Sequence, residues 1–75
     1  MVNFEKTLAS MKKNPQGWRI EDVQRMADQE SIKWRQGKGS HCLFDFGETI
    51  LSIPAKRPIK PFYIKQFVKL LETRG

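Results

Sequence analysis

The stretch Ser31-Ile-Lys-Trp-Arg-Gln-Gly-Lys-Gly-Ser-His-Cys-Leu-Phe-Asp-Phe46 decides the fold of this chain. Apolar and polar residues alternate in both of its halves, which is the period of a β-strand with one buried face. The glycine-rich centre, from Gly37 to His41, interrupts the alternation and is typical of a hairpin turn. The stretch therefore predicts two antiparallel strands, over residues 31–36 and 41–46, joined by a short loop.

A third strand is predicted over residues 49–53, because Gly47-Glu48 forms a turn signal directly before it. Alternation across the three strands predicts one apolar face, made of Ile32, Trp34, Cys42, Phe44, Phe46, Leu51 and Ile53. The opposite face then carries Lys33, Arg35 and His41. We expect helices to cover the apolar face and the cationic face to stay open.

Three helices are predicted from apolar residues that recur three or four positions apart. The first ends at Asn14-Pro15, because proline disfavours helix in the residue before it, and the last begins at Pro61 and ends at Gly75. The three apolar stripes are Phe4, Leu8 and Met11; Ile20, Val23, Met26 and Ala27; and Ile64, Phe67, Val68 and Leu71. The order is α-α-β-β-β-α, which predicts one α+β domain over residues 1–75, with two layers and the helices on one face of a three-stranded antiparallel sheet.

Length and composition exclude several classes of protein. With 75 residues, 39% hydrophobic and 29% charged, the chain is too short for a large multi-step enzyme and too apolar for general disorder. A single cysteine excludes an internal disulfide, and the few Cys and His residues predict neither a metal nor a cofactor. Since there is no signal peptide and no apolar run of roughly 20 residues, we expect a cytoplasmic protein that is not in a membrane.

The net charge of +6 is unevenly distributed along the chain. Cations and anions cancel in residues 1–30, whereas residues 31–65 carry seven cations against Asp45 and Glu48. The excess charge thus falls in the half of the chain that contains the hairpin. A concentration of positive charge of this kind predicts a polyanionic partner, which is most often a nucleic acid and less often an acidic protein or a membrane surface.

The residues that suit chemistry on a phosphate gather around the predicted hairpin loop. Glycine lets a phosphate approach the main chain closely, Lys38 supplies charge, and His41 exchanges protons near neutral pH. His41, the sole histidine, is therefore the candidate catalytic residue. The candidate residues for binding a nucleic acid, which the resemblance given below makes RNA, are Lys33, Arg35, Lys38, Gly39, Ser40, Lys56 and Arg57.

Several of these features together resemble the HicA toxins of bacterial toxin-antitoxin systems. They are Arg35-Gln36, the triplet Gly39-Ser40-His41 at the start of the second strand, a third strand that ends at Pro54, a basic loop, and the closing segment Lys60-Pro-Phe-Tyr-Ile-Lys-Gln-Phe-Val-Lys-Leu-Leu71. The resemblance covers about residues 31–75. It implies a fold like that of double-stranded-RNA-binding domains, metal-independent cleavage of mRNA by His41, and a HicB-like antitoxin protein that covers the catalytic surface.

The chemistry asked of His41 can be stated in physical terms. Internal cleavage of RNA needs a base for the ribose 2′-hydroxyl, cations around the phosphorus, and an acid for the leaving 5′-oxygen. With one histidine, the second proton transfer falls to Lys38, the Ser40 hydroxyl or water. Two alternatives remain open: a non-catalytic module that binds structured RNA, and a small interaction domain whose basic face pairs with an acidic protein. In each case we expect the free chain to be a monomer.

Overall fold

The computed structural model describes residues 4–55 and 58–73, and this part of the chain forms three helices and one antiparallel sheet. The elements, in chain order, are α1 (Phe4–Lys13), α2 (Ile20–Gln29), β1 (Lys33–Gln36), β2 (His41–Asp45), β3 (Ile50–Pro54) and α3 (Pro61–Thr73). The predicted order α-α-β-β-β-α and the α+β class are confirmed. The element ends differ by one or two residues, and the predicted helix end at Gly75 lies outside the described residues.

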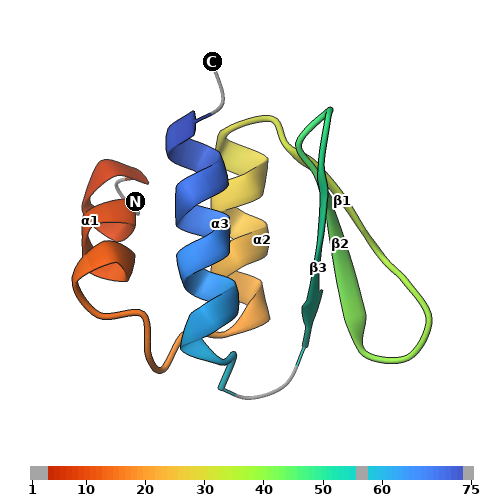
Figure 1. Cartoon of the computed structure of the whole chain (residues 1–75), viewed down its shortest axis with the longest axis horizontal. Helices are drawn as coiled ribbons and strands as arrows, with labels where there is room; N and C mark the ends of the chain where they lie inside the picture. Colours follow the sequence, from red (N-terminus) through yellow and green to blue (C-terminus); the bar gives the residue numbers. More distant parts are fainter. Residues whose placement is uncertain (1–3, 56–57, 74–75) are drawn as a thin grey trace.

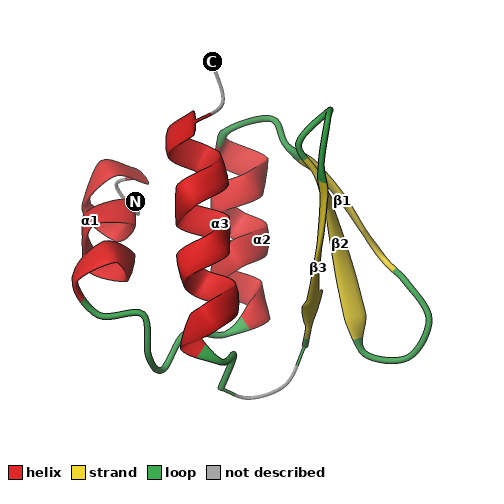
Figure 2. Ribbon diagram, in the orientation of Figure 1, coloured by secondary structure: helices red, strands yellow, loops and turns green. Residues whose placement is uncertain are grey.

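All three helices lie on the same side of the sheet (Figures 1 and 2). Helices α2 and α3 lie between the sheet and α1, which packs mainly against α3 (Figure 1). No described element covers the other side of the sheet, as predicted (Figure 2). That uncovered side is called the open face below.

The strands follow one another across the sheet in the order β1-β2-β3, and both neighbouring pairs are antiparallel. Because side chains alternate between the two faces, every second residue of each strand points to the open face. The register and the hydrogen bond between Gly37 N–H and the carbonyl of His41 align these residues in three rows across the sheet. From β1 to β3, the first row holds Lys33, Asp45 and Ile50, the second Arg35, Leu43 and Ser52, and the third Gly37, His41 and Pro54.

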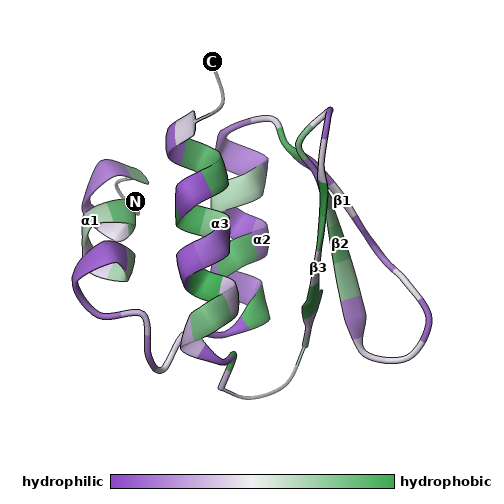
Figure 3. Cartoon of the chain, in the orientation of Figure 1, coloured by the Kyte–Doolittle hydropathy of each residue, from purple (hydrophilic) through white to green (hydrophobic). Residues whose placement is uncertain are grey.

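The core lies between the sheet and the two helices that cover it. The apolar side chains of β2 and β3 on this face are Cys42, Phe44, Leu51 and Ile53, and all four are buried, which confirms the predicted strand faces. They meet the apolar sides of α2 and α3, for example where the ring of Phe44 contacts that of Phe67 edge-on at 5.7 Å. Apolar residues dominate β2 and β3, whereas β1 and the loop after it are mostly hydrophilic (Figure 3).

The start of β1 is set by the way α2 ends. The N–H of Ile32 bonds to the carbonyl of Ala27, and that of Ser31 bonds to Asp28, which is the hydrogen-bond pattern of a Schellman cap. This pattern requires a left-handed backbone at Ser31, whose φ is 57°. Ser31 and Ile32 therefore belong to the helix cap, and the strand begins at Lys33 instead of the predicted residue 31.

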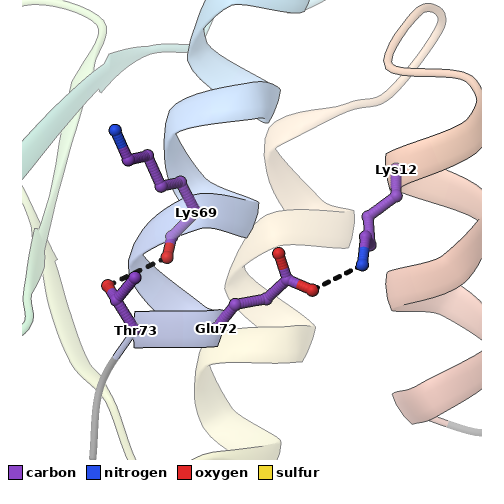
Figure 4. Close-up of polar contacts among 4 residues, drawn as sticks. All are labelled: Lys12, Lys69, Glu72 and Thr73. Atoms are coloured by element: carbon purple, nitrogen blue, oxygen red, sulfur yellow. Dashed lines mark hydrogen bonds and ion pairs between the residues drawn. The ribbon is translucent and has the colours of Figure 1, made fainter.

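Helix α1 is held in place by apolar packing and by an ion pair to α3. The side chain of Met11 is 1% exposed, and Phe4 and Leu8 are partly buried against the core. Beside it, the Lys12 Nζ lies 2.5 Å from Oε2 of Glu72, and both side chains are about half exposed (Figure 4). In the last turn of α3, the Thr73 hydroxyl donates to the carbonyl of Lys69 at 3.0 Å (Figure 4). Apolar packing, rather than the surface ion pair, thus accounts for most of the attachment of α1.

Candidate nucleic-acid interface

Strand β1 places two of the predicted cations, Lys33 and Arg35, side by side on the open face. Both are exposed, and neither forms a hydrogen bond or ion pair through its side chain with another described residue. Lys33 lies directly opposite Asp45 in the register, yet no ion pair joins these two side chains. Because no described side chain neutralises these charges, they are available to an anion in solution.

The predicted catalytic residue, His41, opens β2 and lies on the same face. Its neighbours in the third row are Gly37 and Pro54, and the cation Arg35 lies in the next row on the same face. The ring is exposed, and no other described residue donates a hydrogen bond to it or accepts one from it. A free imidazole in this position can take a proton from a bound group or give one to it.

The loop before His41 holds the other predicted residues of the hairpin. Gly39 has a φ of +68°, a left-handed conformation that glycine adopts without strain, and an added Cβ there would meet no atom within 4 Å. Lys38 and Ser40 are exposed on either side of it. The backbone N–H of Ala55 bonds to the carbonyl of Ser40 at 2.5 Å, which fixes the loop to the end of β3.

The structure therefore brings together six of the eight predicted site residues, in two groups. Lys33 and Arg35 lie on β1, and residues 38–41 form the loop and the first position of β2. The other two, Lys56 and Arg57, lie outside the described residues. The chain reaches them directly after Ala55.

A shallow hollow of about 410 Å³ lies on the open face, next to the row that contains His41. Its lining consists of Lys33, Trp34, Arg35, Leu43, Asp45 and Ile50. This volume falls within the range of small-molecule sites. The alternation that predicts His41 on this face also puts Leu43 and Asp45 there, two and four residues further along the strand. It does not predict the hollow, nor the part of Ile50 of β3, which is 60% exposed.

Asp45 has a defined position at the edge of this hollow. One carboxylate oxygen, Oδ1, accepts the backbone N–H of Gly47 at 2.8 Å, which closes the turn between β2 and β3. No other described residue donates a hydrogen bond to the carboxylate. The carboxylate is thus held in place by its turn and remains exposed on a face whose other described charges are the cations Lys33 and Arg35.

Cys42, next to His41 in the sequence, points into the core instead of the open face. Its side chain is 0% exposed, and the Gln24 amide donates to its sulfur at 3.6 Å. Burial raises the pKa of the Cys42 thiol above its ordinary value, and the hydrogen bond from Gln24 partly opposes this shift. The buried, protonated thiol is therefore a core group and takes no part in the site.

No three His, Cys, Asp or Glu side chains in residues 4–55 and 58–73 gather in a way that could hold a metal ion. Within the same ranges, none of the helices combines the length and the apolar character that crossing a membrane requires.

Comparisons with protein-family models, with curated proteins and with solved structures give no match to this chain.

Proposed function

We propose that this chain is the toxin component of a HicA-type toxin-antitoxin system and cleaves mRNA on the open face of its sheet. The supporting observation is that Lys33, Arg35 and His41 share one uncovered face and have no side-chain partner among the described residues. A face of this composition attracts a polyanion and presents it to a proton-transfer group. The resemblance around Gly39-Ser40-His41 supplies the reaction class.

Binding in this proposal is mainly electrostatic. Lys33, Arg35 and Lys38 contact phosphates, which fix the strand on the sheet without reading its sequence. The open hairpin at Gly39 lets a phosphate approach the backbone next to Lys38. A flat sheet face of this kind suits either the wide, shallow minor groove of double-stranded RNA or an unpaired strand.

His41 acts as the general base that takes the proton from the ribose 2′-hydroxyl. The adjacent cations stabilise the charge that develops on the phosphate in the transition state. Since His41 has no second histidine beside it, Lys38, the Ser40 hydroxyl or water protonates the leaving 5′-oxygen. A single well-placed base is worth about 10²- to 10⁴-fold in rate, which suits a slow nuclease.

The proposed partners follow from the same face. A HicB-like antitoxin binds the open face and excludes RNA from His41. The free toxin is a cytoplasmic monomer in which residues 1–75 form one domain. Its action needs neither a metal nor another cofactor.

The test is expression of the wild type and of His41→Ala in a bacterial host, with growth and mRNA integrity followed after induction. Ser52→Ala is the matched control, because Ser52 is exposed on the same face but outside the proposed machinery. Growth arrest and mRNA loss with the wild type and Ser52→Ala, but not with His41→Ala, support the proposal. Full cleavage by purified His41→Ala would contradict it.

A second candidate, RNA binding without cleavage, is favoured by one feature of His41. Catalytic histidines are commonly oriented by a hydrogen bond to a neighbouring group, and no described residue forms such a bond here. In that case His41 is one more polar contact to RNA. Purified protein would then bind labelled RNA with strong salt dependence and leave it intact over a long incubation.

A further inference from the structure

The hollow on the open face has a chemistry that phosphate binding does not explain. Its lining combines the apolar side chains of Leu43 and Ile50 with three charged residues, Lys33, Arg35 and Asp45, and Trp34 completes it. A phosphate gains nothing from an exposed isoleucine, and it is repelled by a carboxylate. A partly apolar lining that also offers donors and an acceptor instead matches a flat ring with polar edges, such as a nucleobase.

Asp45 narrows the choice of base. Its carboxylate can only accept hydrogen bonds, so the group that it meets must be a donor. Guanine is the one common RNA base whose Watson–Crick edge carries two adjacent donors, N1–H and the 2-amino group. Cytosine and adenine have one amino group beside an acceptor, and uracil has one N–H between two carbonyls. A carboxylate therefore pairs with guanine through two hydrogen bonds and with the other bases through one.

Arg35 supplies the complementary group. It lies in the row next to Asp45, across the strand pair from Leu43. A guanidinium donates well to the O6 and N7 atoms of guanine, which are acceptors. Because it has five N–H donors, Arg35 can make this contact and still donate to a neighbouring phosphate. The carboxylate and the guanidinium thus match the donor and acceptor edges of the same base.

The position of the hollow also suits cleavage. Leu43 is two residues along β2 from His41 and points to the same face, so their Cα atoms are about 7 Å apart. A base that packs on Leu43 then belongs to a nucleotide adjacent to the phosphate that His41 contacts.

We infer that this hollow binds an unpaired guanine of RNA and that Asp45 selects it. The inference rests on the proposed function, since it assumes that RNA lies on the open face. It goes beyond that function because it assigns a base preference and the residue that causes it.

The experiment measures binding of uridine heptamers that differ only in a central G, A, C or U and carry 2′-O-methyl groups to prevent cleavage. Fluorescence anisotropy at fixed salt gives each dissociation constant. We expect the wild type to bind the guanine heptamer about tenfold more tightly than the others, as a good bidentate pair allows. In Asp45→Asn this preference should fall below about twofold, since the amide has one acceptor oxygen instead of two.

Two features separate the loss of the hydrogen-bond acceptor at Asp45 from effects on the turn and on net charge. Asparagine keeps an oxygen for the N–H of Gly47, so the turn is preserved, and thermal unfolding verifies this. Glu48→Gln is the matched control, because it removes the same charge from the neighbouring turn, outside the lining of the hollow. Glu48→Gln should retain the guanine preference.

The outcomes separate this inference from the proposed function. Equal, salt-dependent binding of all four heptamers by the wild type overturns the base site and leaves RNA binding intact. A guanine preference that persists in Asp45→Asn overturns the role of Asp45. If no heptamer binds at any salt concentration, both the inference and the proposed function fail.

Discussion

The indole nitrogen of Trp34 donates a hydrogen bond to Oδ1 of Asp28 over 2.9 Å, which joins β1 to the last turn of α2. The ring is half-buried because β1 is an edge strand. We expect Trp34→Ala to lower the free energy of unfolding by about 2 kcal/mol, less than the 3 to 5 kcal/mol of a fully buried aromatic residue.

Trp34→Phe separates the hydrogen bond from the packing. Trp34→Phe should lower the free energy of unfolding by about 1 kcal/mol, the net value of one hydrogen bond. Adding Asp28→Ala to this variant should lower it little further, because the hydrogen bond is already lost. Urea unfolding of the two single variants and the double variant measures this. Additive losses would show that the two side chains do not interact in solution.

Ser31 occupies a position that glycine usually fills at the end of a helix. Its φ of 57° is strained for a residue with a Cβ, so Ser31→Gly should raise the free energy of unfolding by about 0.5 to 1 kcal/mol. Ser10→Gly, within α1, is the control and should lower it by about 0.5 kcal/mol. A loss of stability in Ser31→Gly would mean that the left-handed cap does not form.

The attachment of α1 should depend on Met11 much more than on Lys12. Met11→Ala removes most of a buried side chain and should lower the free energy of unfolding by about 2 to 5 kcal/mol. Lys12→Gln breaks an exposed ion pair and should lower the free energy of unfolding by less than about 1 kcal/mol, a loss that should shrink at high salt because salt screens the pair. Thermal unfolding of both variants tests whether Met11→Ala is the more destabilising change. Equal losses of stability in the two variants would contradict this prediction.

Burial of Cys42 should make stability fall at alkaline pH. Because its pKa is raised in the folded chain, the thiol stays protonated there while the unfolded thiol ionises. The stability that it contributes is complete below the unfolded pKa and is lost above it, by at most about 1.4 kcal/mol per pH unit. Urea midpoints between pH 7 and 10 test this. Cys42→Ala, which is less stable throughout, should lack this decline.

Lys33 and Arg35 should affect RNA binding without affecting stability. Replacement of either by alanine should weaken binding and lower the slope of log K against log salt by about 0.7 for each lost contact to a single strand. Lys13→Ala, an exposed cation of α1, is the charge-matched control and should leave the slope unchanged. Equal effects of all three variants would point to a diffuse charge effect instead of a defined face.

Much of the fold could be predicted because alternation and helical spacing directly reflect burial. Phe44 and Ile53 are buried and Lys33 and Arg35 are exposed, as the pattern of alternation requires. The cap at Ser31 could not be predicted, since serine carries no signal for a left-handed backbone. The hollow depends on the register between strands, which places Ile50 beside Asp45 and cannot be read from one strand alone.

The two outer strands have a consequence for how separate molecules behave. Hydrogen bonds alternate in direction along an antiparallel strand, so half of the backbone groups of β1 and β3 point away from β2. Such groups favour joining of sheets from different molecules. Short strands, the missing N–H of Pro54 and mutual repulsion at a net charge of +6 all oppose this joining. The positive charge thus also provides colloidal stability, and binding of a polyanion removes part of that protection.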